Sequence, residues 1–119
     1  MRMLLSVEVP VKTVSEMNNR DCWQKRSRRS REQKVKTKAV VESALRKVRV
    51  GGDRFMVKLT RVGQRRLDGD NCQSSLKYCR DAVAECLRID DGDERITWEY
   101  GQEKAKKAGV YSVIVEVWE

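Results

Sequence analysis

The sequence of 119 residues contains no histidine, one proline and one phenylalanine. Without imidazole, a metal site in this chain has to draw its side-chain ligands from carboxylates or thiolates. No apolar run approaches the roughly 18 to 20 residues that cross a bilayer. The first five residues are too short an apolar run for a signal peptide, and Glu8 prevents a longer one. We therefore expect no membrane partner and a cytoplasmic location.

Three of the four cysteines are spaced by seven residues, at positions 72, 79 and 86. Seven residues is a helix repeat rather than a metal-ligand or redox spacing, and Leu76 and Val83 fall on the same seam. Cysteine packs as a small hydrophobe on such a face. The spacing therefore predicts reduced cysteines in a helical core, with a zinc or disulfide role as the less favoured alternative.

The net charge of +8 is divided unevenly along the chain. Residues 1–66 carry 19 Lys and Arg against 6 Asp and Glu, a net +13, whereas residues 67–119 carry 7 against 12, a net −5. A basic half beside an acidic half indicates a polyanion-binding surface next to a carboxylate site that needs a cation. Solvated surface cations remain the alternative.

Local patterns predict one domain over residues 1–119, with the order β-α-β-α-β-β. Alternating apolar residues predict four strands, at residues 3–9, 55–59, 96–100 and 111–117. Apolar spacing of three and four predicts two main helices, one from Arg28 to the Gly51-Gly52 stop and one of about 16 residues after an Asp68–Asn71 loop. Residues 11–27 show no clear period, and residues 101–109 look like a basic hairpin connection.

These elements define an α+β (mixed α/β) fold in which the helices cover a small mixed sheet. Because 39% of the residues are hydrophobic and 37% are charged, the core of so short a chain must be thin. Small domains of this kind often complete their burial by pairing with a second copy. We therefore expect a dimer.

Two acidic clusters carry the strongest chemical signal: Asp68-Gly69-Asp70-Asn71, and Asp90-Asp91-Gly92-Asp93 about twenty residues later. Hydrolysis of a phosphodiester needs an activated water and neutralisation of charge on the phosphate oxygens. Hard divalent ions held by carboxylates do both. The clusters lie at the two ends of one predicted helix, so spacing alone does not prove that they meet.

Other readings of these clusters stay open. Asp68 to Asn71 can be a turn with an N-cap, and Asp90 to Asp93 a turn at the end of a helix. A calcium-binding EF-hand loop is excluded, because Cys72 and Gln73 stand where a ligand and a glycine are needed. From the residues alone, a metal-dependent nuclease, a non-enzymatic nucleic-acid-binding protein and another soluble domain are all possible.

Residues 25–38 hold eight cations in fourteen residues. This density suits a DNA backbone, to which binding weakens steeply as salt rises. A solvated helix face is the alternative. The residues that we expect to contact DNA are cations of this stretch and of the tract before the first acidic cluster: Lys25, Arg26, Arg28, Arg29, Arg65 and Arg66.

Three segments resemble the RusA-like endodeoxyribonucleases, which are Holliday-junction resolvases: Leu67-Asp68-Gly69-Asp70-Asn71, Leu76-Lys77-Tyr78-Cys79-Arg80-Asp81, and Ile89-Asp90-Asp91-Gly92-Asp93-Glu94-Arg95-Ile96. The helix with Leu-Lys and Arg-Asp and the Ile-Asp-Asp-Gly-Asp ending are typical of phage or prophage members. Residues 12–20 and 23–33 are also similar to that family, so the resemblance covers most of the chain and is strongest over residues 65–100.

The resemblance implies a homodimer, in a bacterial or phage-infected cell, that binds four-way or branched DNA. It implies paired nicks made with Mg²⁺, or with Mn²⁺ as a substitute, in DNA recombination and repair. By motif position it assigns Asp68, Asp70 and Asp91 as metal ligands and catalytic residues. Asn71 and Asp90 would support them.

The chain departs from the family pattern at two positions. Some members have a lysine where this chain has Ser74, and the nearest candidate is Lys77, about one helical turn along. Lys77 is therefore either the catalytic lysine or the partner of Asp81 in a surface ion pair. Leu67 replaces an arginine that the neighbouring Arg65 and Arg66 could supply. A degenerate member that binds branched DNA without cutting it is the alternative function.

Overall fold

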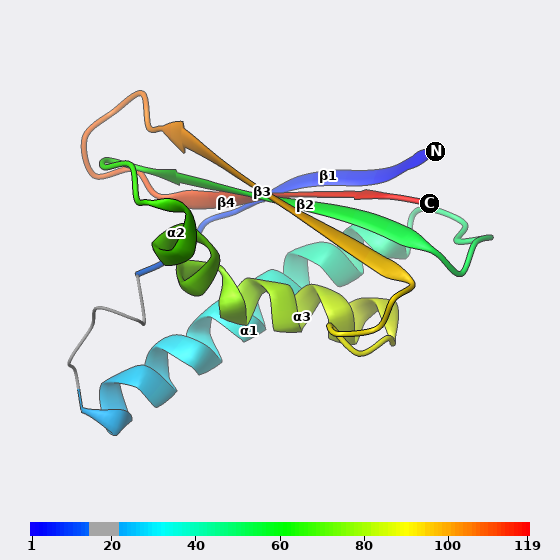
Figure 1. Cartoon of the computed structure of the whole chain (residues 1–119), viewed down its shortest axis with the longest axis horizontal. Helices are drawn as coiled ribbons and strands as arrows, with labels where there is room; N and C mark the ends of the chain where they lie inside the picture. Colours follow the sequence, from blue (N-terminus) through cyan, green and yellow to red (C-terminus); the bar gives the residue numbers. More distant parts are fainter. Residues whose placement is uncertain (15–21) are drawn as a thin grey trace.

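A computed structural model describes residues 1–14 and 22–119, and its four strands form one mixed sheet with helices on one face (Figure 1). This confirms the predicted α+β fold with a small mixed sheet, and the chain has three helices where two main ones were predicted. The elements are β1 (Met3–Val9), α1 (Trp23–Leu45), β2 (Phe55–Gly63), α2 (Gly69–Ser75), α3 (Lys77–Leu87), β3 (Ile96–Lys104) and β4 (Ser112–Trp118). In the part of the chain so described, no helix is both long and apolar enough to span a membrane.

The sheet has the order β1-β4-β2-β3, and β2 with β3 is its parallel pair. The central strand β4 alternates three fully buried valines, Val113, Val115 and Val117, toward the core. Val115 and Val117 pair with Leu59 and Val57 of β2, which are also fully buried. Parallel neighbours need a crossover, and α2 with α3 provide it between β2 and β3. This βαβ unit carries both acidic clusters.

The predicted hairpin over residues 101–109 is wrong. Gly101 lies within β3, and β3 pairs with β2 rather than with β4. The connection after Lys104 therefore passes the end of β2 to reach β4. Two consecutive segments of alternating apolar residues favour a hairpin. In the structure, however, α2 and α3 return the chain so that β3 pairs with one edge of β2, and β4 pairs with the other edge.

Helix α1 begins at Trp23, five residues before the predicted start at Arg28. Its first turns are exposed and highly charged, so they lack the apolar period that marks a packed helix. Further along, Thr37 and Val41 are fully buried against the core. Residues 15–21 lie outside the described residues. They include part of the segment expected to be a loop and the Asn18-Asn19-Arg20 part of the resemblance.

The second predicted helix is two helices, α2 and α3, separated at Leu76. The first of them begins at Gly69, so residues 69–71 are helical and not the loop that was expected. The cysteine seam is confirmed: Leu76, Cys79 and Val83 are fully buried, and the cysteines of the described residues are free thiols. Thr37 Oγ1 of α1 donates a hydrogen bond to Cys79 Sγ at 3.5 Å, which joins the two helices.

We predict that thiol labelling will separate the exposed cysteine from the core cysteines. Burial raises the pKa of the Cys79 thiol to about 11, so at pH 8 it is both covered and protonated. Cys22 is exposed and is expected to react with a thiol-specific dye within minutes, whereas Cys79 should react only when the protein unfolds. The measurement is mass spectrometry of digested protein over a time course. A Cys22→Ser variant should lose the fast phase, and equal labelling rates at Cys22 and Cys79 would refute the predicted helix seam.

Candidate active site

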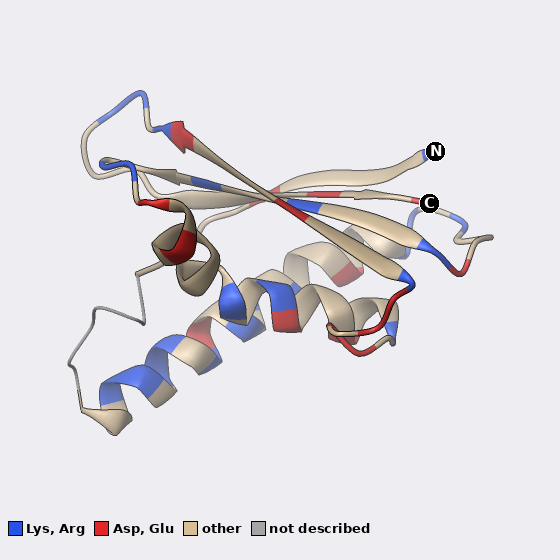
Figure 2. Ribbon diagram, in the orientation of Figure 1, with Lys and Arg blue, Asp and Glu red and all other residues tan. Residues whose placement is uncertain are grey.

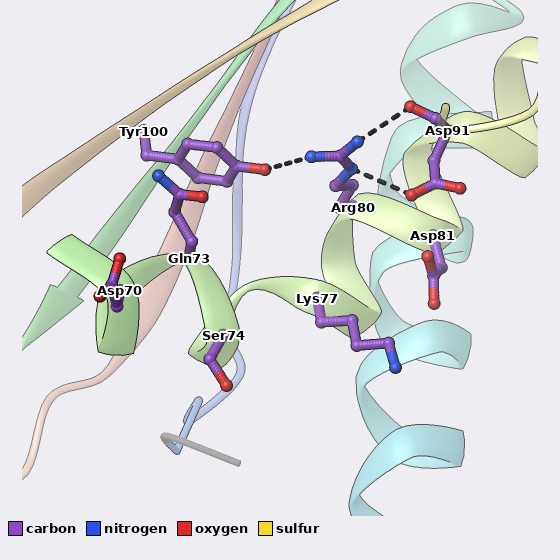
Figure 3. A pocket seen from close by; sticks show the side chains of 8 residues that line it. All are labelled: Asp70, Gln73, Ser74, Lys77, Arg80, Asp81, Asp91 and Tyr100. Carbon is purple, nitrogen blue, oxygen red and sulfur yellow. Dashed lines mark hydrogen bonds and ion pairs between the residues drawn. The ribbon is translucent and has the colours of Figure 1, made fainter. Parts of the chain in front are cut away.

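A surface cavity of about 430 Å³ lies where α2, α3, β3 and the turn after α3 meet (Figure 3). Its lining is polar and carries charges of both signs. The residues that line it are Asp70, Gln73, Ser74, Lys77, Arg80, Asp81, Asp91 and Tyr100. Residues from both predicted acidic clusters therefore face one cavity, which the sequence spacing left open.

Asp68 is the N-cap of α2. Its Oδ1 accepts a hydrogen bond from the backbone N–H of Asn71 at 2.9 Å, and its Oδ2 accepts one from Asn71 Nδ2, also at 2.9 Å. An N-terminal carboxylate satisfies a free helix N–H and is stabilised by the helix dipole. The capping alternative considered for this cluster is thus correct for Asp68, and Asn71 supports Asp68.

The predicted trio of metal ligands is not assembled in the structure. Asp70 and Asp91 line the same cavity, with Asp70 at one end and Asp91 at the other (Figure 3). Asp68 lines the adjoining cavity instead, because it turns back to cap its own helix. Across residues 1–14 and 22–119, no three acidic or cysteine side chains lie close enough to share one ion.

Arg80 of α3 holds the turn that carries Asp91. Its Nε donates to Asp91 Oδ2 at 3.1 Å, its Nη2 to the Asp91 carbonyl at 3.0 Å, and its Nη1 to the Tyr100 hydroxyl at 2.6 Å. The guanidinium also lies 4.7 Å from the ring centre of Trp98, whose Nε1 donates to the same Asp91 carbonyl at 2.9 Å. Arg80, Trp98 and Tyr100 together fix the position of Asp91.

The other acidic residues of the second cluster have separate surroundings. Asp90 is exposed and lines a smaller cavity on the far side of Asp91. Asp93 forms two side-chain hydrogen bonds with Arg95, and these hold the pKa of the Asp93 carboxyl down to about 2. Asp93 is therefore a structural residue of the turn, whereas Asp90 stays beside the predicted site.

Lys77 begins α3 and extends toward the side of the cavity where Asp81 lies (Figure 3). Asp81 has its ion pair with Lys34 of α1, at 4.0 Å, and Lys77 adds a weaker attraction. Burial and the nearby Asp91 raise the pKa of the Asp81 carboxyl. Lys77 thus lines the cavity, and Ser74 lines it as well.

The predicted DNA-contacting cations lie on either side of the first acidic cluster. Lys25, Arg26 and Arg28 are exposed on the first turns of α1, and Arg29 is partly exposed. Figure 2 shows this basic half of α1 on one side of α2 and a second group of basic loops on the other. Arg65 and Arg66 are exposed in that second group, directly before the Asp68 cap.

The sequence analysis predicts no functional role for Gln73, Trp98 or Tyr100. Arg80 appears there only as a member of one motif of the resemblance. Nothing in the sequence paired Arg80 with Asp91. The signal that could have found these residues is the alternation of Trp98 and Tyr100 on one face of a strand that follows a helix with a cation.

No protein-family model matches the chain. A search of curated proteins likewise finds no match.

We predict that Arg80→Met will release the Asp91 turn. Hydrogen bonds to charged groups contribute about 1.5–3 kcal/mol when buried, and this partly exposed cluster should lose about 1–2 kcal/mol of unfolding free energy. Tyr100→Phe removes only one of the contacts and should cost less. Urea unfolding measures both, and hydrogen exchange of the Asp90–Asp93 amides should speed up in Arg80→Met. Unchanged exchange there would show that Arg80 does not hold the turn.

Proposed function

We propose that this protein is a Mg²⁺-dependent endonuclease of the RusA-like type that cuts branched DNA. The observation that carries the proposal is that Asp70 and Asp91, from two separate clusters, face one cavity together with Lys77 and Arg80. Carboxylates paired with cations in an open cavity suit a phosphodiester and a divalent ion. The flanking basic surfaces supply the attraction for DNA.

The residues present fit Mg²⁺ by their chemistry. This ion prefers oxygen ligands and is commonly held by one or two carboxylates, with waters and substrate phosphates completing its shell. Asp70 and Asp91 would each offer one carboxylate to such an ion, from opposite ends of the cavity, and Mn²⁺ suits the same oxygens. When bound, the ion would lower the pKa of a bound water and neutralise charge on the phosphate. A cavity of about 430 Å³ has room for a hydrated ion and a phosphate group.

The chain's own residues have distinct tasks in this proposal. Lys77 and Arg80 offer positive charge to the phosphate, and Arg80 also orients Asp91. Asp68 positions the first turn of α2, so that Asp70 faces the cavity. Without a cation, Asp70 and Asp91 repel the DNA backbone.

The choice of branched DNA over linear DNA would come from two such sites at a set spacing in a homodimer. Phosphate contacts alone carry little sequence information, so shape would decide which DNA is cut. The homodimer and the four-way junction remain predictions from the family resemblance.

A second candidate is a branched-DNA-binding protein that does not cut. The structure holds Asp91 by Arg80 and Asp68 by Asn71, and Ser74 stands where relatives have a lysine. Such a protein would use the same basic surfaces and would bind equally well in EDTA.

The deciding experiment incubates the purified protein with a labelled four-way junction or a matched linear duplex, in Mg²⁺, Mn²⁺ or EDTA. Symmetric nicks in the junction that need the metal, with the duplex spared, support the endonuclease. Tight junction binding without cutting in either metal supports the second candidate, and Ser74→Lys is then the first variant to make.

We predict that Asp70→Asn and Asp91→Asn each lower cleavage by at least about 100-fold, because each removes a charged ligand. Junction binding in EDTA should stay equal or tighten, since a repulsive charge is lost. Asp53→Asn is the matched control, an exposed aspartate outside the cavity that should cut normally. Gel cleavage assays and fluorescence anisotropy measure the two properties. A folded Asp70→Asn that cuts at the wild-type rate would exclude Asp70 as a ligand.

We predict that replacing Arg28 and Arg29 together by alanine weakens binding to every DNA tested. Loss of two phosphate contacts should reduce the slope of log affinity against log salt by about 1.8. Anisotropy titrations at several salt concentrations provide this slope. An unchanged slope would place the DNA surface elsewhere than the first half of α1.

A further inference from the structure

The cavity of about 430 Å³ that holds Asp70 and Asp91 forms one end of a longer trough. It shares Gln73 and Tyr100 with a second cavity of about 370 Å³ beside Asp68. That cavity shares Arg66 and Gln102 with a third, of about 320 Å³, at the ends of β2 and β3. The three cavities therefore run in series, from the seam between the α2–α3 pair and β3 to the ends of β2 and β3.

The far end of this trough is basic. Arg65, Arg66 and Lys104 line it together with one carboxylate, Glu103, and Lys106 and Lys107 come next in the exposed connection to β4. We call Asp70 and Asp91 the acidic pair. Five cations thus lie beyond Asp68, on the side of the acidic pair away from the basic half of α1 (Figure 2). We define these five residues as the distal basic tract.

The distal basic tract is held in place by hydrogen bonds. Gln64 Nε2 donates to the carbonyl of Lys107 at 2.9 Å and to that of Val110 at 3.1 Å. The backbone N–H of Ala105 donates to the carbonyl of Gly63 at 2.9 Å. The connection after β3 is therefore attached to the end of β2, and its lysines project from a braced loop.

Further contacts join the tract to the acidic pair. Gln102 holds Leu67 from both sides, because its Oε1 accepts from the Leu67 N–H at 2.8 Å and its Nε2 donates to the Leu67 carbonyl at 2.7 Å. Below the tract, Arg61 is 7% exposed, and its Nη1 donates to the Arg65 carbonyl at 2.7 Å. A side chain at Gly63 would collide with this guanidinium, since a Cβ there would lie 2.9 Å from Arg61 Nη1.

We propose that the distal basic tract binds the phosphates that lie next to the cut phosphate on the same DNA strand. This inference rests on the proposed function. The order of charge along the trough, with Asp70 and Asp91 toward one end and the basic tract at the other, matches a polyanion that needs a metal at one phosphate and direct cation contacts at its neighbours. The tract is a backbone contact separate from α1, and the two hold DNA on opposite sides of the acidic pair.

The experiment compares two triple variants. Lys104, Lys106 and Lys107 are replaced by alanine in the test variant, and Arg46, Lys47 and Arg49 in the control. The control removes the same charge from exposed residues just beyond the end of α1, at the other end of the molecule (Figure 1). Anisotropy in EDTA measures junction affinity from 50 to 200 mM salt, so the readout does not depend on cleavage.

The test variant should reduce the salt slope by about 2 to 3, because each lost phosphate contact removes about 0.7 to 0.9. The control should reduce it by less than 1. Ethylation interference should show, in the wild type, phosphates on one side of the cut or junction centre whose modification blocks binding. That block should disappear in the test variant and persist in the control.

Equal slopes for the test and control variants would overturn the inference, even if the protein cuts junctions normally. A slope loss confined to the test variant would support it even if no metal supports cutting, so the tract and the proposed chemistry can fail separately. Competition by an acidic peptide as effective as DNA of equal charge would also overturn it, since the tract would then bind anions without regard to a nucleic-acid backbone.

Discussion

The candidate site depends on the hydrogen bonds that Arg80 makes to the Asp91 turn. A turn after a helix has few backbone constraints of its own, and an isolated carboxylate on it would point into water. Arg80 binds both the carboxylate and the carbonyl of Asp91, and Trp98 binds that carbonyl from the neighbouring strand. The position of Asp91 is therefore set by contacts from α3 and β3 in addition to the hydrogen bonds within the turn.

The two aspartates of the first cluster have different surroundings because of their positions in helix α2. Asp68 lies before the first turn of α2 and satisfies the Asn71 N–H, whereas Asp70 lies inside that turn and faces the cavity. The cap stabilises the helix, and the helix then directs Asp70. One motif thus supplies both a capping carboxylate and a carboxylate that lines the cavity, so Asp68 does not join Asp70 and Asp91 there.

The parallel pairing of β2 and β3 is what brings the two clusters together. The crossover through α2 and α3 starts at one end of β2 and returns the chain to its neighbour, so Asp70, Arg80 and Asp91 lie along one seam. Leu76, just before α3, and Cys79 and Val83 on the buried face of α3 anchor this seam to the core. The same pairing sends the chain past the end of β2, where the basic connection lies next to Arg65 and Arg66.

Local patterns were enough to predict the four strands, the cysteine seam, the mixed α+β class and the residues of both acidic clusters, because each depends on spacing along a single segment. The local patterns missed the exposed start of α1, because its charged residues show no apolar periodicity. They also predicted one helix where the structure has two, separated at Leu76. Sequence spacing offered the Asp68 cap as one alternative, but it did not show that Asp70 and Asp91 share a cavity or that Arg80 links Asp91 to β3. Tertiary structure alone decided this, because those contacts join residues from separate elements whose pairing depends on how the strands are ordered in the sheet.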